Sequence, residues 1–204
     1  MTYVVLEGPD GCGKSSQAVA LAAWLRDQGR GVVHVREPGS TPVGEALRQL
    51  LLATSTGELR PITEALLFSA ARAELVANVI APAVQRGDVV VAERCYLSTV
   101  VYQSLAVAGG LDVEQILDVT RAAHGAHLPD VIFVLDVDAE VARGRRRTRS
   151  ADRIEARGDG YHDRVRAGFV RACELEVRAR RIDATRSFDD VQADLRAQVA
   201  GWTA

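Results

Sequence analysis

The sequence has few cysteines and no long apolar run. Its three cysteines, Cys12, Cys95 and Cys173, are odd in number and lie at no metal-like spacing, which argues against a disulfide framework and against a zinc site. No stretch reaches the roughly 18 uninterrupted apolar residues of a membrane helix, and no basic leader precedes the first apolar run. We therefore expect a cytoplasmic protein without a membrane partner.

Lysine is nearly absent, which makes the one lysine informative. Of 25 basic residues, Lys14 is the only lysine and the other 24 are arginine. Such a bias enriches arginine everywhere, so arginine clusters are weak functional signals and a single retained lysine is a stronger one. The formal net charge of -2 still hides a basic segment, residues 143–157, which is a candidate contact for anions. Its seven arginines are Arg143, Arg145, Arg146, Arg147, Arg149, Arg153 and Arg157.

The composition is typical of one globular domain, with 204 residues of which 48% are hydrophobic and 25% charged. Short apolar runs predict buried strands near residues 3–7, 32–35, 89–92 and 131–137, with a weaker candidate at 180–184. Because these runs are continuous, both faces of the sheet should be covered, which favours a three-layer α/β fold with about five parallel strands. Helical spacing is found at roughly 14–28, 43–53, 62–86, 98–107, 113–124, 139–147, 160–178 and 188–200. We expect a single domain over residues 1–204, with Pro82 kinking or ending the long helix.

A phosphate-binding loop follows the first predicted strand. Gly8-Pro9-Asp10-Gly11-Cys12-Gly13-Lys14-Ser15 satisfies G-x-x-x-x-G-K-[ST] and stands between a predicted strand and a predicted helix. In such a loop, backbone N–H groups and the helix N-terminus surround the β-phosphate, the lysine bridges β- and γ-oxygens, and the Ser15 hydroxyl ligates Mg²⁺. The expected ATP- and phosphate-binding residues here are Gly8, Asp10, Gly11, Cys12, Gly13, Lys14, Ser15 and Ser16.

The loop indicates a nucleotide but not a reaction. A GTPase would need an Asn-Lys-x-Asp guanine reader, yet Asn78 is the only asparagine and no lysine follows it. Motor and transport ATPases need larger chains and partner domains. A small kinase, whose second substrate is itself small, is the class that remains.

Four further segments give the chain a family resemblance. They are Arg36-Glu37-Pro38-Gly39-Ser40-Thr41-Pro42, then Phe68 to Arg72, then Glu93-Arg94-Cys95-Tyr96-Leu97-Ser98-Thr99 with Tyr102-Gln103, and finally Asp152-Arg153-Ile154-Glu155. In this order and spacing, from Val4 to about residue 195, the chain resembles the thymidylate kinases. The resemblance implies a P-loop kinase fold, homodimers formed through helices that include the long one, and transfer of the γ-phosphoryl of ATP to dTMP with Mg²⁺.

The resemblance also implies where dTMP binds. Asp10 would accept a hydrogen bond from the sugar 3′-hydroxyl, Arg48 and Arg94 would clamp the acceptor phosphate, and Glu37 would orient the loop after the second strand. Phe68 and Arg72 share a helix face, so that thymine would stack on Phe68 while Arg72 meets a base carbonyl. The remaining expected dTMP contacts are Ser98, Thr99 and Gln103, with the last two reading the pyrimidine edge, and Tyr102, which would exclude a ribose hydroxyl.

Two features concern the transferred phosphoryl group. Glu93 ends a buried strand and is the expected acidic partner of Mg²⁺ beside Ser15, although the family usually has Asp-Arg followed by Tyr, His or Phe where this chain has Glu93-Arg94-Cys95. Because position 12 is cysteine, the arginine on the phosphoryl group should come from a mobile arginine-rich lid at about 143–158, with Arg153 the best match and Arg149 the second. The expected catalytic groups are Lys14, Glu93, Arg94 and Arg153.

Two alternatives remain open. One is a deoxynucleoside kinase, which phosphorylates a sugar 5′-hydroxyl, because Glu93-Arg94-Cys95 weakly resembles a segment of those enzymes. Such an enzyme would need fewer arginines to bind an acceptor phosphate. An arginine-patch nucleic-acid binder with a nucleotide switch is disfavoured, because no aromatic residue lies between Phe133 and Tyr161 to stack on a base. We therefore expect no nucleic-acid partner. The four histidines show no partner pattern, and we expect them at the surface or in loops.

Overall fold

A computed structural model, which describes residues 2–146 and 152–201, contains one sheet of five parallel strands. The strand order is β2-β3-β1-β4-β5. This confirms the predicted α/β fold with a five-stranded parallel sheet. The strands are β1 (Tyr3–Glu7), β2 (Val32–Arg36), β3 (Val89–Glu93), β4 (Val131–Asp136) and β5 (Ala179–Asp183).

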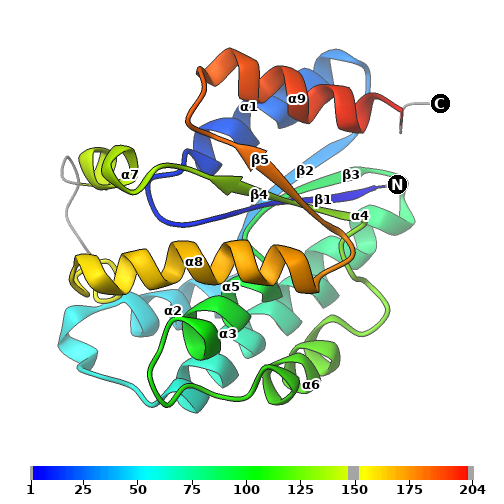
Figure 1. The fold of residues 1–204 in the computed structure, drawn as a ribbon. Coiled ribbons are helices and arrows are strands. Elements are labelled where there is room, and N and C mark those ends of the chain that lie inside the picture. Colours follow the sequence, from blue (N-terminus) through cyan, green and yellow to red (C-terminus); the bar gives the residue numbers. More distant parts are fainter. Residues whose placement is uncertain (1, 147–151, 202–204) are drawn as a thin grey trace.

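Helices cover both faces of the sheet, as Figure 1 shows. Helices α1 and α9 pack on one face, and α8, α5, α4 and α3 lie on the other. Each face carries its own apolar core, the first around Leu6 and Leu21 and the second around Val5 and Phe169. The helices are α1 (Lys14–Asp27), α2 (Pro42–Leu52), α3 (Pro61–Leu75), α4 (Ala81–Gln85), α5 (Tyr96–Val100), α6 (Val113–His124), α7 (Ala139–Arg146), α8 (Asp159–Leu175) and α9 (Phe188–Ala200).

Local chemistry sets several of these helix boundaries. The Thr41 hydroxyl accepts a hydrogen bond from the Gly44 N–H at the start of α2, with Pro42 in the first turn. Asp112 and Gln115 form a capping box at the start of α6. Helix α1 begins directly after Gly13, which adopts φ 96°, a conformation that an L side chain rarely tolerates. The phosphate loop therefore turns into α1 as the motif predicts.

The long helix differs from the prediction in how it accommodates Pro82. The helical segment is continuous from Pro61 to Gln85, with a π-helical turn at Val76–Ile80 between α3 and α4. Pro82 has no N–H to donate to the carbonyl one turn earlier, and the wider π turn lets the helix continue past it. A second π-helical turn, Val101–Leu105, follows α5 where a single α-helix was predicted.

The segment from Pro61 to Gln85 is long and apolar enough to cross a membrane, with a window of mean hydropathy 1.4. Such a segment also occurs as the core helix of a protein without membrane spans. Here it packs against α2 and α6, and it carries Glu64 and Arg72 as buried ion-paired residues. We therefore assign it as a core helix.

The predicted lid falls partly outside the described residues. Its start lies in α7, and its end includes the turn at Asp152–Arg157 that leads to α8. Arg149, a predicted phosphate contact, lies outside the described residues, as does Arg147.

Candidate active site

A cavity of about 620 Å³ opens at the carboxyl edge of the sheet. The strand order explains its position, because β1 leads into the phosphate loop and its neighbour β3 ends at Glu93 beside it. The cavity also takes residues from α2, α3 and the segment after β3. The predicted site residues that line it are Asp10, Gly11, Gly13, Lys14, Ser15, Ser16, Glu37, Arg48, Phe68, Arg72, Glu93, Arg94, Ser98, Thr99, Tyr102 and Gln103.

The phosphate loop curls around the ammonium group of Lys14. Its Nζ donates to the carbonyl oxygens of Gly8 at 2.8 Å and Pro9 at 2.9 Å, and it lies 3.8 Å from an Asp10 oxygen. Gly8 is needed for close approach, because a Cβ there would lie 2.5 Å from the Leu135 carbonyl oxygen. Neither Gly8 nor Cys12 lines the cavity, and the Cys12 side chain packs in the core under the loop. Any phosphate contact of Cys12 would therefore come from its backbone.

Ser15 and Glu93 meet at the predicted metal position. The Ser15 hydroxyl donates to Glu93 Oε2, and His34 Nε2 on β2 lies 3.0 Å from Glu93 Oε1. Burial opposes ionisation of Glu93, but hydrogen bonds from His34 and Ser15 outweigh it and lower the pKa of the carboxyl. The Ser15 hydroxyl and the Glu93 carboxylate are hard oxygen donors, which Mg²⁺ prefers. Mg²⁺ in kinase sites is typically held by one or two such protein ligands together with substrate phosphates, so these two residues fit it. This chain has Glu93 where the family usually has aspartate, and His34 contacts the Glu93 oxygen that does not face Ser15.

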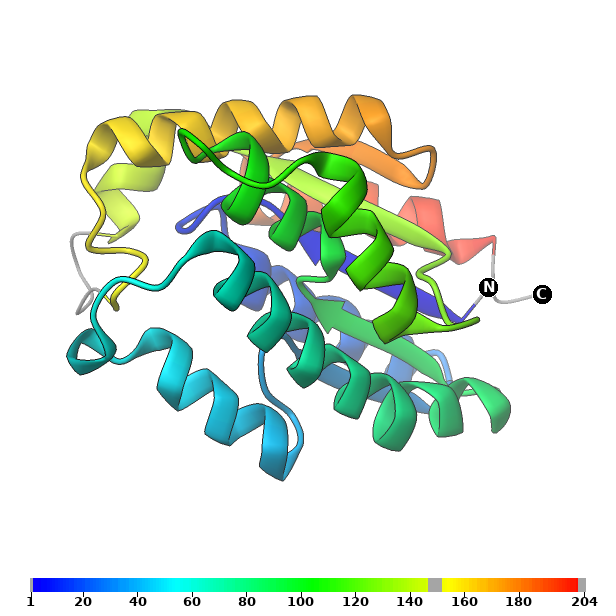
Figure 2. The ribbon, with the colours of Figure 1, turned by 90° about the horizontal axis from the view of Figure 1, so that it is seen from below.

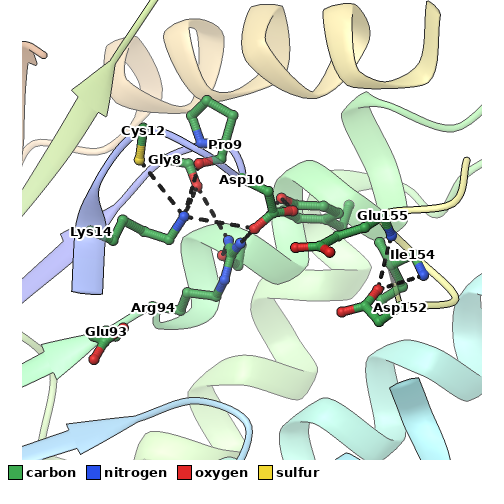
Figure 3. A network of polar contacts seen from close by, with 12 residues as sticks. Gly8, Pro9, Asp10, Cys12, Lys14, Glu93, Arg94, Asp152, Ile154 and Glu155 are labelled. Carbon is green, nitrogen blue, oxygen red and sulfur yellow. Dashed lines mark hydrogen bonds and ion pairs between the residues drawn. The ribbon is translucent and has the colours of Figure 1, made fainter. Parts of the chain in front are cut away.

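Asp10, Arg94 and Tyr102 form a second cluster, shown in Figure 3 around Asp10 and Arg94. Arg94 Nη2 pairs with Asp10 Oδ1, and the Tyr102 hydroxyl donates to Asp10 Oδ2 at 3.0 Å. Burial raises the pKa of Asp10, yet Arg94 and Lys14 more than offset this and lower it to about 2. The carboxylate is therefore ionised at neutral pH and acts as an acceptor only.

Glu7, which the sequence analysis did not single out, holds this segment in place. The side chain is fully buried at the end of β1 and accepts hydrogen bonds from the N–H groups of Cys95 and Ser98 and from the Ser98 hydroxyl. Arg94 just before them has φ 70°, a strained conformation for a residue with a side chain. An acidic residue ending an apolar strand was the signal that identified Glu93, and the same signal was present at Glu7.

The far end of the cavity contains a buried ion pair. Arg72 Nε donates to Glu37 Oε2 at 2.7 Å, and Arg72 Nη2 donates to the Thr99 hydroxyl at 3.1 Å. Glu37 thus fixes Arg72 rather than the loop after β2. Glu45 orients that loop instead, since its carboxylate accepts from the Ser40 N–H and from Arg36.

Arg48, on α2, also lines the cavity. Its Nη1 donates to the Pro38 carbonyl at 3.0 Å. Burial and then the nearby charge of Arg36 lower the pKa of Arg48. These surroundings leave a cation that an anion would stabilise.

Three buried polar atoms at this end have no hydrogen-bond partner among residues 2–146 and 152–201. They are Arg72 Nη1, a donor, and two acceptors, Gln103 Oε1 and Glu37 Oε1. The Gln103 Nε2 donates to Glu64 at 3.0 Å, which leaves the oxygen side of the amide for the cavity. Phe68 lines the same end and supplies an aromatic surface. This arrangement can hold a flat ring that offers one acceptor and one donor on neighbouring atoms.

The structure does not bring Arg153 into the cavity. Its guanidinium pairs with Glu64 at 2.7 Å and donates to the Leu51 carbonyl, and Arg153 is not among the lining residues. Asp152 causes this orientation, because its carboxylate accepts from the N–H groups of Ile154 and Glu155 and so fixes a turn that directs Arg153 toward α3. The described lid arginine that does reach the phosphate loop is Arg145, which donates to the Gly11 carbonyl at 3.2 Å. The arginine bias of the segment hid it from sequence analysis.

The expectation that the histidines lie at the surface or in loops is wrong for His124 and His162, which are buried in helices, whereas the His34 side chain is 25% exposed. His34 lies on β2 beside Glu93. His124 is buried in α6 with its ring edge-on to Tyr96, and burial lowers its pKa to about 3. His162 is buried in α8 and contacts the Glu155 carbonyl at 3.0 Å.

Comparisons with known proteins agree with the site. A family model described as thymidylate kinase matches residues 6–195. A thymidylate kinase of Symbiobacterium thermophilum is 43% identical over 198 residues, which cover 97% of this chain and 92% of that protein. A thymidylate kinase of Pseudomonas putida is 40% identical over 201 residues, covering 98% and 95%. The crystal structure of thymidylate kinase from Ehrlichia chaffeensis superposes with a TM-score of 0.78 at 27% identity and covers 98% of each chain. These matches span nearly the whole chain, and the chain therefore belongs to the thymidylate kinase family.

Proposed function

We propose that this chain transfers the γ-phosphoryl group of ATP to dTMP and so forms dTDP. The observation that carries the choice of acceptor is the pair of unpartnered buried atoms, Arg72 Nη1 and Gln103 Oε1. Thymine offers a carbonyl acceptor at C4 next to an N–H donor at N3, which matches this donor and acceptor. Cytosine presents an amino donor and a ring acceptor at the same positions, and each mismatch leaves a buried polar group unpaired.

The donor half of the reaction uses the phosphate loop. The loop N–H groups and the N-terminus of α1 hold the β-phosphate, and Lys14 bridges the β- and γ-phosphates. Ser15 and Glu93 would hold Mg²⁺, which when bound neutralises charge on the phosphates. Arg145 reaches the loop from α7 and adds a cation beside Gly11. We keep Arg153 and Arg149 as candidate phosphoryl contacts of another lid arrangement, with Arg145 the one that this structure favours.

The acceptor half needs positioning more than proton transfer. A phosphate monoester is already anionic near neutral pH, so no strong base is required and the barrier lies in bringing two polyanions together. Arg94 and Arg48 supply positive charge on the acceptor side of the cavity. Asp10, which is ionised and aligned by Arg94, would accept a hydrogen bond from the sugar 3′-hydroxyl. Tyr102 would limit the space beside C2′ of the sugar. A neutral 5′-hydroxyl acceptor would make these arginines a poor fit, which disfavours a deoxynucleoside kinase.

A substrate panel tests this function. Purified protein with Mg-ATP should convert dTMP to dTDP, convert dCMP far more slowly and ignore thymidine, as followed by chromatographic separation of the nucleotides. The same assay with EDTA should show no turnover. Faster turnover of thymidine than of dTMP would replace the proposal by the deoxynucleoside kinase alternative.

We further propose a single-domain organisation and a cytoplasmic location. One continuous five-stranded sheet supports a single kinase domain over residues 1–204. We propose that it acts in the cytoplasm on small-molecule substrates, without nucleic-acid or membrane partners.

We also propose that two copies associate through the α2–α3 face, defined here as Val43, Leu50, Ile62 and Leu66. These four apolar side chains are all more than two-fifths exposed, with Leu66 at 51%. They lie on adjacent helices that run side by side in Figure 2. Neighbouring exposed apolar residues on one surface are typical of a protein interface.

The charge-introducing variant Leu66→Glu tests this face. We expect the wild-type chain to sediment as a dimer and Leu66→Glu to sediment as a monomer, because a buried unpaired carboxylate disfavours association. Val177→Glu is the matched control, since Val177 is an apolar side chain that is 80% exposed and lies away from this face. A wild-type monomer, or a dimer that survives Leu66→Glu, would refute the proposal.

A further inference from the structure

Glu64 is a buried carboxylate with two hydrogen-bonding partners, Gln103 and Arg157, and a further ion-pair partner, Arg153. Only 2% of its surface is exposed, and it does not line the cavity itself. Its Oε1 pairs with the guanidinium groups of Arg153 at 2.7 Å and Arg157 at 3.0 Å. Its Oε2 accepts the hydrogen bond from Gln103 Nε2 at 3.0 Å. The carboxylate therefore joins the turn that ends the lid to the residue that faces the base.

The contact to Gln103 has a fixed polarity. An ionised carboxylate only accepts hydrogen bonds, so the side of the Gln103 amide that faces Glu64 must be its NH₂ group. The oxygen is then left for the cavity, where it has no partner among the described parts of the chain. The guanidinium groups of Arg153 and Arg157, which can only donate, face the other oxygen, so Oε2 is the atom that meets Gln103.

We propose that Glu64 is a positioning residue that sets the choice of pyrimidine, by forcing Gln103 to present an acceptor to the base. This inference rests on the proposed function, because it concerns the acceptor of that same reaction. Glu64 does not touch the substrate and acts through Gln103. The acceptor class that it selects is a pyrimidine with a protonated N3, and the class that it rejects is one with an unprotonated N3.

The isosteric variant Glu64→Gln should reverse which end of the Gln103 amide faces the cavity. Its new amide has one oxygen and one NH₂ group, and two guanidinium groups on one side require the oxygen there. The NH₂ group then faces Gln103, which must turn its oxygen toward position 64 and its NH₂ group toward the cavity. The cavity would present two donors, which leaves the N3–H of thymine unpaired and gives the N3 of cytosine a partner.

The measurement is the ratio of kcat/KM for dTMP to that for dCMP, with direct binding of both monophosphates by calorimetry. Glu64→Gln should lower this ratio on the order of tenfold to a hundredfold, the effect of one buried polar group left unpaired. Glu74→Gln is the matched control, because Glu74 lies on the same helix and contacts Asn78 at the surface. It should leave the ratio unchanged.

Two double variants separate positioning from a structural role. Gln103→Leu removes the amide, so adding Glu64→Gln to it should change the dTMP/dCMP ratio no further. The exchange Glu64→Gln with Gln103→Glu keeps the total charge and again places an acceptor toward the cavity, so it should restore selectivity for dTMP. This exchange also provides the test if Glu64→Gln alone fails to fold.

The outcomes distinguish the possible failures. Unchanged selectivity in Glu64→Gln, or an exchange variant that folds and does not regain selectivity, overturns the role of Glu64. An effect of Glu64→Gln that persists in the Gln103→Leu background overturns it as well. A wild-type chain that does not prefer dTMP to dCMP overturns the proposed acceptor itself, independently of Glu64.

Discussion

Replacing Lys14 by alanine is expected to lower kcat for dTDP formation on the order of 10²–10³-fold, the effect of removing one preorganised charge from a transition state. The Nζ of Lys14 lies within 2.9 Å of two loop carbonyls and 3.8 Å from Asp10, so its position is fixed before substrate arrives. Lys14→Arg keeps the charge but spreads it over a planar fork, and should recover little of the rate. Steady-state kinetics with Mg-ATP and dTMP measure the effect.

Because lysine is scarce, the role of Lys14 can also be tested by chemical modification. Since Lys14 is the only lysine in the sequence, acylation of side-chain amines can modify one site. We expect loss of activity to parallel modification of the peptide that contains Lys14, and Mg-ATP to protect it. Arg26→Ala is the control for the alanine substitution, because Arg26 is exposed at the other end of the same helix, and this variant should keep its activity. A Lys14→Ala variant with kcat close to that of the wild type would remove Lys14 from the mechanism.

The second large effect concerns stability. Arg72→Leu should lower the free energy of unfolding by about 3–5 kcal/mol, because it leaves the buried carboxylate of Glu37 without its cation. The pair is well buried, with Arg72 2% and Glu37 4% exposed in their side chains. Urea unfolding followed by circular dichroism measures the change.

Two comparisons identify the cause of that loss. The double variant Glu37→Leu with Arg72→Leu should regain most of the stability, since no unpaired charge remains, but it should not regain binding of dTMP. Arg36→Ala breaks the exposed pair with Glu45 and should cost less than about 1 kcal/mol. If Arg72→Leu costs no more than Arg36→Ala, the buried pair does not stabilise the fold as we describe.

The fold was largely predictable because its strands carry a strong local signal. The runs at 3–7 and 89–92 are continuous and apolar, and the structure places β1 and β3 there, with β3 extended by one residue to Glu93. Thr41 and Pro42 likewise marked the start of α2. The π-helical turns were not predictable from spacing, since they depend on how Pro82 and the cavity-facing residues after α5 are accommodated in the packed structure.

Local motifs brought most predicted site residues to one cavity, whereas the long-range contacts were missed. Lys14, Glu93 and Arg72 stand in motifs whose chemistry can be read from adjacent residues. The partners of Glu64 lie far from it in the sequence, at Gln103, Arg153 and Arg157, so only the packed structure reveals them. For the same reason the sequence favoured Arg153 as the phosphate contact, while the structure places Arg145 at the loop.

A crystal structure grown with ADP and dTMP together tests most directly whether one cavity holds both nucleotides. We expect the β-phosphate of ADP within the loop at residues 11–16, and the thymine ring on Phe68 with its C4 carbonyl and N3–H facing Arg72 and Gln103. The phosphate of dTMP should lie near Arg94 and point at the ADP. A monophosphate bound outside this cavity, or bound inside it with its base away from Arg72, would contradict the account.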